Sequence, residues 1–200
     1  MEFQPDYRQF AAVMANERPD RLPLYEHLVD PEMMEDVLGV SFAGLVAGDA
    51  SDRDQFFAHY TRFFREMTYD VVSFEVCITE FLPGPGALRG GRPGPIQDRS
   101  DFESYPWEEL SDMFWEHAAG RFEALARNLP AGMKAVGGVG NGPFEISEDL
   151  VGLEYLPLMG ADDPALYADL YLRIGELMED LWAEFLDRYS DAFVACRVGD

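Results

Sequence analysis

Residues 134–145 read KAVGGVGNGPFE, an apolar run in which four glycines lead to a proline. The spacing GGVGNG differs from the GxGxxG of dinucleotide-binding turns, in which a helix also begins at the last glycine. Here Pro143 and Phe144 predict that the chain stays extended beyond Gly142. Glycines at the carboxyl end of a barrel strand let a ligand approach the backbone. We therefore interpret 134–140 as a strand that ends at a pocket, and not as a phosphate-binding loop.

Three other runs are predicted to be strands, at 22–28, 70–78 and 192–198. Segments with helical spacing of apolar residues separate them, and 163–189 is the clearest. Such alternation predicts an α/β fold with parallel strands neighbouring one another in chain order. A complete (β/α)8 barrel takes about 250 residues. The sequence therefore predicts one domain over residues 1–200, of the (β/α)8 TIM-barrel type and truncated to its first four βα units.

The elements between the strands follow from capping residues, apolar spacing and glycine content. The glycine- and proline-rich residues 82–95 predict a long surface loop. The aromatic residues of 56–64 are predicted to pack in the core and not to stack on bases. Helices are predicted at 7–18, 30–39, 52–69, 105–129 and 163–189.

Composition restricts the partners of the chain. The 200 residues carry a formal net charge of −23, so nucleic acid and anionic membrane surfaces are poor partners. The first ten residues lack the apolar run of a signal peptide, and no stretch has the length of a membrane span, which predicts a cytoplasmic protein. Cys77 and Cys196 have no CxxC or CxH context, so neither a disulfide framework nor a zinc motif is predicted.

Several stretches, taken in order, resemble one enzyme family. They are RPDRLPLYEHL (18–28), YDVVSFEVCITEFLPGPGALRG (69–90), GGVGNGPFE (137–145), DDPALY (162–167) and DAFVACRVGD (191–200). This order is similar to that of the uroporphyrinogen decarboxylase superfamily, which includes the decarboxylase of haem biosynthesis and the methylcobamide:coenzyme M methyltransferases. The resemblance implies a (β/α)8 barrel enzyme, a lyase or a methyltransferase. Its site would lie at the carboxyl ends of the strands and take a small-molecule, tetrapyrrole or corrinoid ligand.

Departures from the family pattern favour a corrinoid-linked methyltransferase type, or an uncharacterised relative, over a true porphyrinogen decarboxylase. The decarboxylase has an arginine pair after its first strand that grips the substrate carboxylates, whereas residues 22–52 contain no arginine or lysine. The methyltransferases bind zinc through a His-x-Cys pair and a later cysteine. Zinc is therefore expected only with ligands from a C-terminal half that follows these 200 residues.

Candidate site residues lie at or near the predicted carboxyl ends of the strands. Glu75 is a carboxylate in an apolar strand, where an unpaired charge is costly, and Arg197 is its predicted counter-charge. Catalysis is assigned to Glu75, Glu145 and His27. Substrate binding is assigned to Glu26, Cys77, Glu80, Asn141, Arg197 and Asp200, and no metal site is predicted.

Each assignment has a plainer alternative. His27 can be a structural histidine and Cys77 a buried thiol, or the two can be metal ligands. Asn141 and Glu145 can be a turn residue and an acid that leads a helix. Because the candidates are mostly acids and amides, the pocket is expected to suit a neutral or cationic ligand. The alternative to an enzyme is a non-catalytic half-barrel that associates with itself, as a homodimer, or with another chain through open strand edges.

Overall fold

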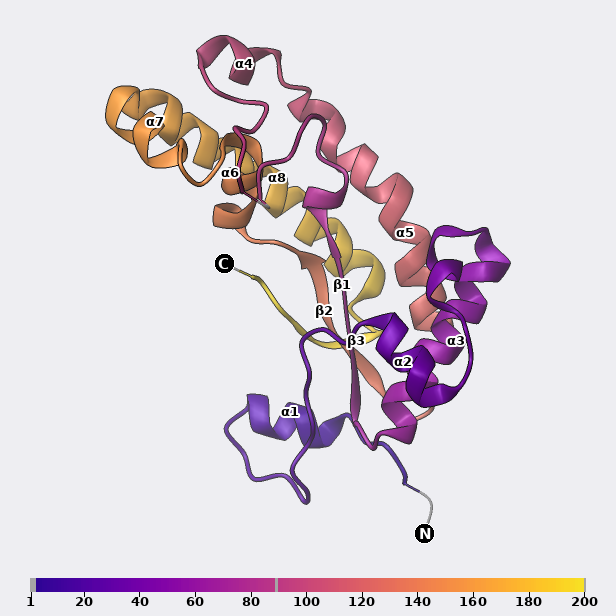
Figure 1. Ribbon diagram of the computed structural model, residues 1–200. Coiled ribbons are helices and arrows are strands. Elements are labelled where there is room, and N and C mark those ends of the chain that lie inside the picture. The colour runs from indigo at the N-terminus through magenta and orange to yellow at the C-terminus, as the bar shows by residue number, and fades with distance from the viewer. Residues whose placement is uncertain (1–2, 89, 200) are drawn as a thin grey trace. The chain divides into compact units, whose positions relative to one another are not determined.

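The structure, a computed structural model, describes residues 3–88 and 90–199. Its sheet has three strands in the order β1-β2-β3 (Figure 1). They are β1 (Val71–Cys77), β2 (Lys134–Gly140) and β3 (Phe193–Cys196). β2 and β3 are parallel, and helices connect each strand to the next. The chain is therefore an α/β protein, and the predicted order of these three strands is confirmed.

The predicted first strand is wrong, because residues 22–28 form no strand in the structure. The N–H groups of Asp20 and Arg21 donate to Oε1 of Gln9, at 2.8 and 3.4 Å. Pro23 has no N–H to contribute to a ladder. The two residues just before the segment are thus bound to a side chain and not to a neighbouring strand. Within the described residues the sheet is open, and no closed barrel forms.

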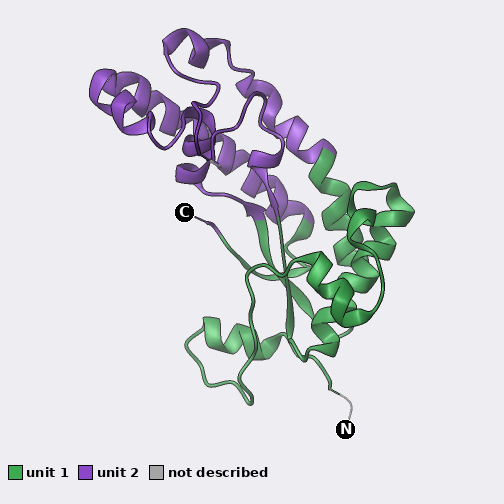
Figure 2. Ribbon diagram, viewed as in Figure 1, with its two compact units in different colours: residues 1–75, 117–138, 189–197 green, residues 76–116, 139–188, 198–200 purple. Residues whose placement is uncertain are grey.

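The chain divides into two compact units (Figure 2). Unit 1 comprises residues 1–75, 117–138 and 189–197, and unit 2 comprises 76–116, 139–188 and 198–200. Unit 1 holds α1 (Arg8–Met14), α2 (Pro31–Leu38), the 3-10 turn η1 (Ala43–Ala47) and α3 (Ala50–Glu66). Unit 2 holds η2 (Ile78–Glu80), α4 (Arg99–Ser104), η3 (Trp107–Glu109), α6 (Pro143–Val151) and α7 (Leu156–Asp162). Residues of α5 (Leu110–Asn128) and α8 (Pro164–Tyr189) belong to both units.

The aromatic core of unit 1 packs α3 against one face of β1. Asp49 caps α3 and accepts from the N–H groups of Ser51 and Asp52, at 2.8 and 3.0 Å. The Phe74 ring lies 4.9 Å from that of Phe57. The predicted core packing of the aromatic residues on α3 is confirmed, because all of them are buried: Phe56, Phe57, Tyr60, Phe63 and Phe64.

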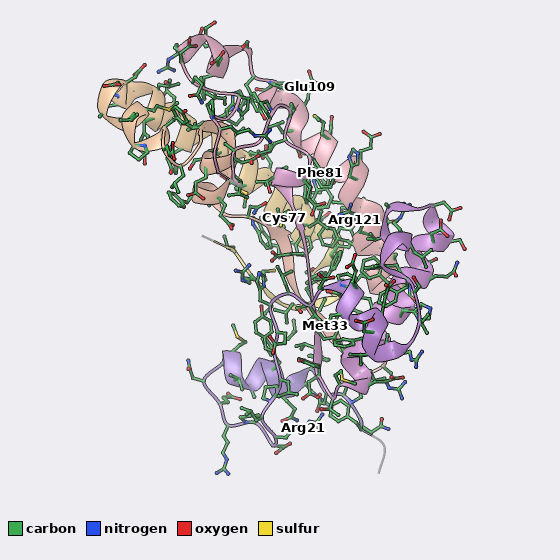
Figure 3. All side chains as sticks on the ribbon, in the orientation of Figure 1. Arg21, Met33, Cys77, Phe81, Glu109 and Arg121 are labelled. Atoms are coloured by element: carbon green, nitrogen blue, oxygen red, sulfur yellow. The ribbon has the colours of Figure 1, made fainter. Side chains whose placement is uncertain are left out.

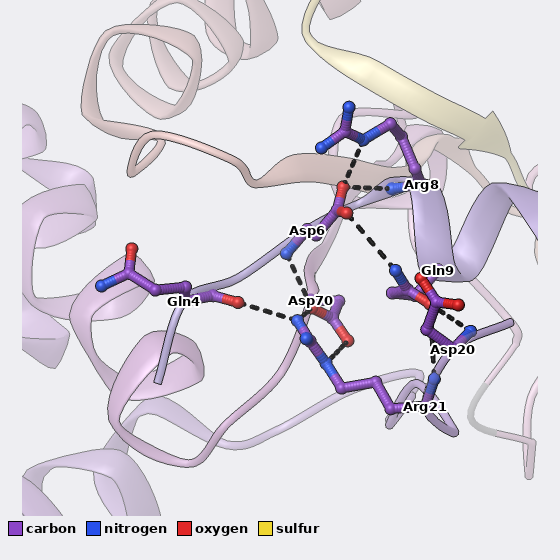
Figure 4. A network of polar contacts seen from close by, with 7 residues as sticks. All are labelled: Gln4, Asp6, Arg8, Gln9, Asp20, Arg21 and Asp70. Atoms are coloured by element: carbon purple, nitrogen blue, oxygen red, sulfur yellow. Dashed lines mark hydrogen bonds and ion pairs between the residues drawn. The ribbon is translucent and has the colours of Figure 1, made fainter. Parts of the chain in front are cut away.

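A polar network ties the N-terminal segment to the start of β1 (Figure 4). The Asp70 side chain is 1% exposed, and it accepts from the backbone N–H of Asp6 at 2.7 Å. The Arg21 guanidinium binds both carboxylate oxygens of Asp70, and its Nη2 also donates to the carbonyl of Gln4 at 2.8 Å. Both oxygens of the buried Asp70 carboxylate therefore accept hydrogen bonds, as the burial of a charge requires.

In unit 2, the long helix α8 buries the predicted apolar stripe that includes Leu170, Ile174 and Leu181. The predicted loop at 82–95 contains no helix or strand among its described residues. It is held to α6 by bonds such as those from the N–H groups of Ala87 and Leu88 to Asp149, both 2.9 Å. No helix in the described part of the chain is long and apolar enough to cross a bilayer.

Candidate functional site

Three of the predicted site residues meet in unit 1 around Glu75, whose side chain is 8% exposed. Nη1 of Arg197 lies 3.2 Å from Oε2 of Glu75, and Nε2 of His27 lies 3.5 Å from Oε1. The three residues are far apart in sequence, so only the fold brings them together. The ion pair with Arg197 is the one that the apolar strand around Glu75 predicts, because burial removes most of the hydration of a carboxylate.

Tyr25 extends this group and was not among the predicted site residues. Its hydroxyl lies 3.5 Å from Nδ1 of His27. Burial raises the pKa of the Tyr25 phenol, while the Arg197 charge lowers it and the Glu75 charge raises it. The phenol is therefore neutral at pH 7. Tyr25 lies two residues before His27, and in the strand predicted at 22–28 this spacing would have put both side chains on one face. We call Tyr25, His27, Glu75 and Arg197 the Glu75 network.

Gly137 lets the strands that carry this network approach closely. Its backbone φ is 132°, and a Cβ placed there would lie 2.2 Å from the carbonyl oxygen of Phe74 on β1. On the β3 side, the backbone N–H of Arg197 donates to the Gly137 carbonyl at 3.0 Å. The close approach at this glycine is thus between β2 and β1.

Asn141 and Glu145 form a second polar group, in unit 2. Oδ1 of Asn141 accepts from the Thr79 hydroxyl at 2.8 Å. Oε2 of Glu145 accepts from the Gly142 N–H at 3.1 Å. The prediction that the chain stays extended beyond Gly142 is wrong, because α6 begins at Pro143, where a proline at the first helical position is favourable. The Gly142 N–H, which an anion at this turn would need, already donates to Glu145, so the turn does not offer a phosphate site. Glu145 thus acts as an acid at the start of a helix, which is the plainer of its two predicted roles.

The remaining predicted residues lie elsewhere or outside the described structure. Glu26 is exposed, and its charge adds to burial in raising the pKa of Tyr69. Cys77 ends β1 and is half-buried (Figure 3), and Glu80 ends η2 and is exposed. Asp200 lies outside the described residues. The predicted site residues therefore belong to both units: Glu26, His27, Glu75 and Arg197 to unit 1, and Cys77, Glu80, Asn141 and Glu145 to unit 2.

Zinc does not fit the side chains that the structure places. Among the described residues, no three or more of His, Cys, Asp and Glu come together in an arrangement that could hold a metal ion. The sequence names two possible ligands, His27 and Cys77, whereas a zinc site needs at least three from the protein. The side chains of the Glu75 network can supply proton transfer and hydrogen bonding.

Comparison with known proteins supports the fold. No family model matches the sequence, and no curated protein matches it. Among solved structures, the chain is similar to a methyltransferase from Methanosarcina mazei, with a TM-score of 0.60 and 14% sequence identity. The match covers 96% of this chain and 69% of that one. At 14% identity the likeness shows a shared fold. The similar protein is a methyltransferase, one of the two enzyme classes that the sequence resemblance implies.

Proposed function

We propose that the chain is a methyltransferase-like enzyme in which the Glu75 network is the reactive site. The likeness to the Methanosarcina mazei methyltransferase supports the class of enzyme. The observation that carries the proposal is the contact between His27 and the buried carboxylate of Glu75, with 3.5 Å between Nε2 and Oε1. A carboxylate at one imidazole nitrogen orients the ring and leaves the other nitrogen to exchange a proton.

His27 would act as a general base on the methyl acceptor. With its proton on Nε2, directed to Glu75, it presents the Nδ1 lone pair on the side where the Tyr25 hydroxyl lies, 3.5 Å away. Nδ1 can then take the proton of an acceptor thiol or hydroxyl as its sulfur or oxygen bonds to the methyl carbon, while the bond from that carbon to the methyl donor breaks and the donor keeps the electron pair. Such a base contributes about 10²–10⁴-fold to the rate. Arg197 holds the other oxygen of Glu75, with 3.2 Å between Nη1 and Oε2, so the carboxylate is fixed in position to orient the imidazole.

The same geometry argues against a true porphyrinogen decarboxylase. Arg197 is engaged by Glu75, and residues 22–52 contain no arginine or lysine. A substrate with several carboxylates would find no basic side chain in 22–52 to bind it, and the net charge of −23 would repel it. We infer that uroporphyrinogen is not decarboxylated by this chain.

The test is methyl transfer by the 200-residue chain from methylcobalamin to a thiol such as coenzyme M, followed by cobalamin absorbance. His27→Gln should lower the rate by about 100-fold or more. The control is Asp36→Asn, which removes an exposed acid on α2 and should leave the rate unchanged. If the wild-type chain transfers no methyl group to thiol or hydroxyl acceptors, or if His27→Gln matches wild type, the proposal is wrong. Uroporphyrinogen is tested in a parallel assay, and its decarboxylation would show that the chain is a lyase and not a methyltransferase.

Exposed apolar side chains in unit 1 favour a second candidate, self-association. Leu22 is 81% exposed, Leu28 is 65% exposed and Met14 is 60% exposed. Together with the open edges of the sheet, they offer surface that a second copy would cover. Light scattering should then give at least a dimer, and Leu22→Asp with Leu28→Asp should shift it to monomer. A monomeric wild-type chain would exclude this candidate.

A further inference from the structure

A surface pocket of about 410 Å³ in unit 2 is lined by three aromatic side chains, those of Phe102, Tyr105 and Trp107. The ring centroids of Phe102 and Trp107 are 5.5 Å apart and tilted by 54°. Those of Tyr105 and Trp107 are 5.0 Å apart and nearly perpendicular, at 65°. The rings are half-buried, so they combine fixed packing with exposed surface. We call this the Trp107 pocket.

The local sequence holds these rings in place before any ligand arrives. Pro106 has φ −80° and ψ 57°, and the Trp107 N–H donates to the Tyr105 carbonyl at 2.8 Å, which is an inverse γ-turn. The indole N–H of Trp107 donates to the Phe102 carbonyl at 3.0 Å. The Tyr105 hydroxyl donates to the Pro83 carbonyl, also at 3.0 Å. Since their polar ends are bound to backbone, the rings can offer a ligand only their π surfaces.

The charges around the pocket favour a cation. Glu103, Glu108 and Glu109 line it together with one basic residue, Arg173 (Figure 3 labels Glu109). Arg173 is itself bound to Glu108, and its Nη1 lies 2.9 Å from Glu176. Glu103 also interacts with Arg99. Among the residues that line the pocket, three carboxylates stand against one guanidinium, so the local charge is negative.

One ring of this pocket already contacts a cation. Cζ of Arg99 lies 5.5 Å from the centroid of the Phe102 ring, within the range of a cation–π interaction. Nη1 of Arg99 lies 2.5 Å from Oδ2 of Asp169, so this guanidinium is held at the ring by the protein. The aromatic cluster is therefore suited to cations in the structure itself.

We propose that the Trp107 pocket binds a small quaternary ammonium ion, such as tetramethylammonium or choline. Its methyl groups pack on the exposed surfaces of the aromatic rings, and its diffuse positive charge interacts with the ring quadrupoles and with the carboxylates that line the pocket. A primary ammonium is more strongly hydrated, and an anion would be repelled. The Trp107 pocket shares no residue with the Glu75 network, and the proposal does not depend on the proposed methyl transfer.

The experiment follows the indole N–H signals of the ¹⁵N-labelled chain, which has three tryptophans: Trp107, Trp115 and Trp182. The Trp107 signal, assigned with Trp107→Leu, should shift saturably as tetramethylammonium or choline is added, while the other two stay in place. Calorimetry should show that Trp107→Leu weakens binding about tenfold or more. The matched control, Trp182→Phe, removes an indole from α8 and should keep wild-type affinity.

Two comparisons separate this proposal from non-specific attraction to an acidic protein. The neutral isostere of choline, 3,3-dimethylbutan-1-ol, should bind at least about fivefold more weakly, because it lacks the charge. Glu103→Gln with Glu109→Gln changes only exposed side chains, and should weaken choline binding while leaving the circular dichroism spectrum unchanged. The proposal is overturned if the Trp107 signal does not shift, if the alcohol binds as well as choline, or if sodium chloride at equal ionic strength produces the same shift.

Discussion

Replacing Glu75 with glutamine tests whether the Glu75 network serves catalysis or only stability. The substitution keeps the size of the side chain and one carbonyl acceptor, but it removes the negative charge between His27 and Arg197. An amide oxygen can retain one of the two contacts, the 3.2 Å contact to Arg197 or the 3.5 Å contact to His27. The variant thus weakens the network without opening a cavity.

The expected loss of stability is modest because Arg197 can be hydrated again. Hydrogen bonds to charged groups contribute about 1.5–3 kcal/mol. The Arg197 side chain is 39% exposed, so water replaces part of what the carboxylate supplied. We expect the free energy of unfolding to fall by about 1–2 kcal/mol, and the Tm by about 2–4 °C for each kcal/mol. The methyl-transfer rate should fall by about 100-fold, because an amide no longer fixes the tautomer of His27.

Urea unfolding followed by tryptophan fluorescence measures the first quantity, and the cobalamin assay measures the second. The double variant Glu75→Leu/Arg197→Leu separates them further. It leaves neither charge unpaired, so its stability should equal or exceed that of wild type, while its activity is lost. A Glu75→Gln protein with the wild-type rate would show that the network is structural and would refute the assignment of Glu75.

Three further predictions concern stability, each measured by urea unfolding. Gly137→Ala should lower the free energy of unfolding by at least about 2 kcal/mol, because its Cβ would lie 2.2 Å from the Phe74 carbonyl oxygen; a neutral result would contradict the close approach of β1 and β2. Asp70→Asn should cost about 2 kcal/mol by removing the buried charge that Arg21 binds, and no loss would show that this network is dispensable. Burial raises the pKa of Asp149 above 3.8, so the folded state binds its proton more tightly and stability falls as pH rises from 3.8 through the folded pKa. Asp149→Asn should abolish that fall, and an unchanged pH profile would mean that Asp149 does not cause it.

The sequence is most informative where a residue must find a partner or a fully buried environment. Glu75 lies in an apolar run, so a counter-charge was predicted, and Arg197 supplies it. The strands at 71–77 and 134–140 are buried on both faces, which their composition predicts. The 22–28 segment has strand-like composition as well, but it forms no strand, and the N–H groups of the two residues before it, Asp20 and Arg21, donate to Gln9. No local pattern encodes that contact.

Two wrong predictions concern where helices begin, and in each case a proline nearby gives the correct local signal. The helix predicted at 105–129 begins only at Leu110, because the residue before a proline avoids the helical region and Tyr105 has ψ 138°. That same turn positions the rings of the Trp107 pocket, which no sequence pattern singled out. At Pro143, proline and a glutamate two residues later are the usual start of a helix, and reading them as extended chain hid the capping role of Glu145.

At each candidate site, a different arrangement of side chains would make the folded protein more stable. A pair of apolar side chains in place of Glu75 and Arg197 would avoid the cost of removing two charges from water. Burying the rings of Tyr105 and Trp107 fully would gain about 25 cal/mol for each additional Å² of apolar surface removed from water. The glycine-rich loop at 82–95 is different, because packing on α6 accounts for two of its glycines: a Cβ at Gly86 would lie 2.4 Å from Oδ1 of Asp149, and one at Gly94 would lie 2.3 Å from the backbone of Leu150. Departures from local rules that packing does not explain are expected where a protein meets its ligands, which is why we place the reaction at the Glu75 network and a cation at the Trp107 pocket.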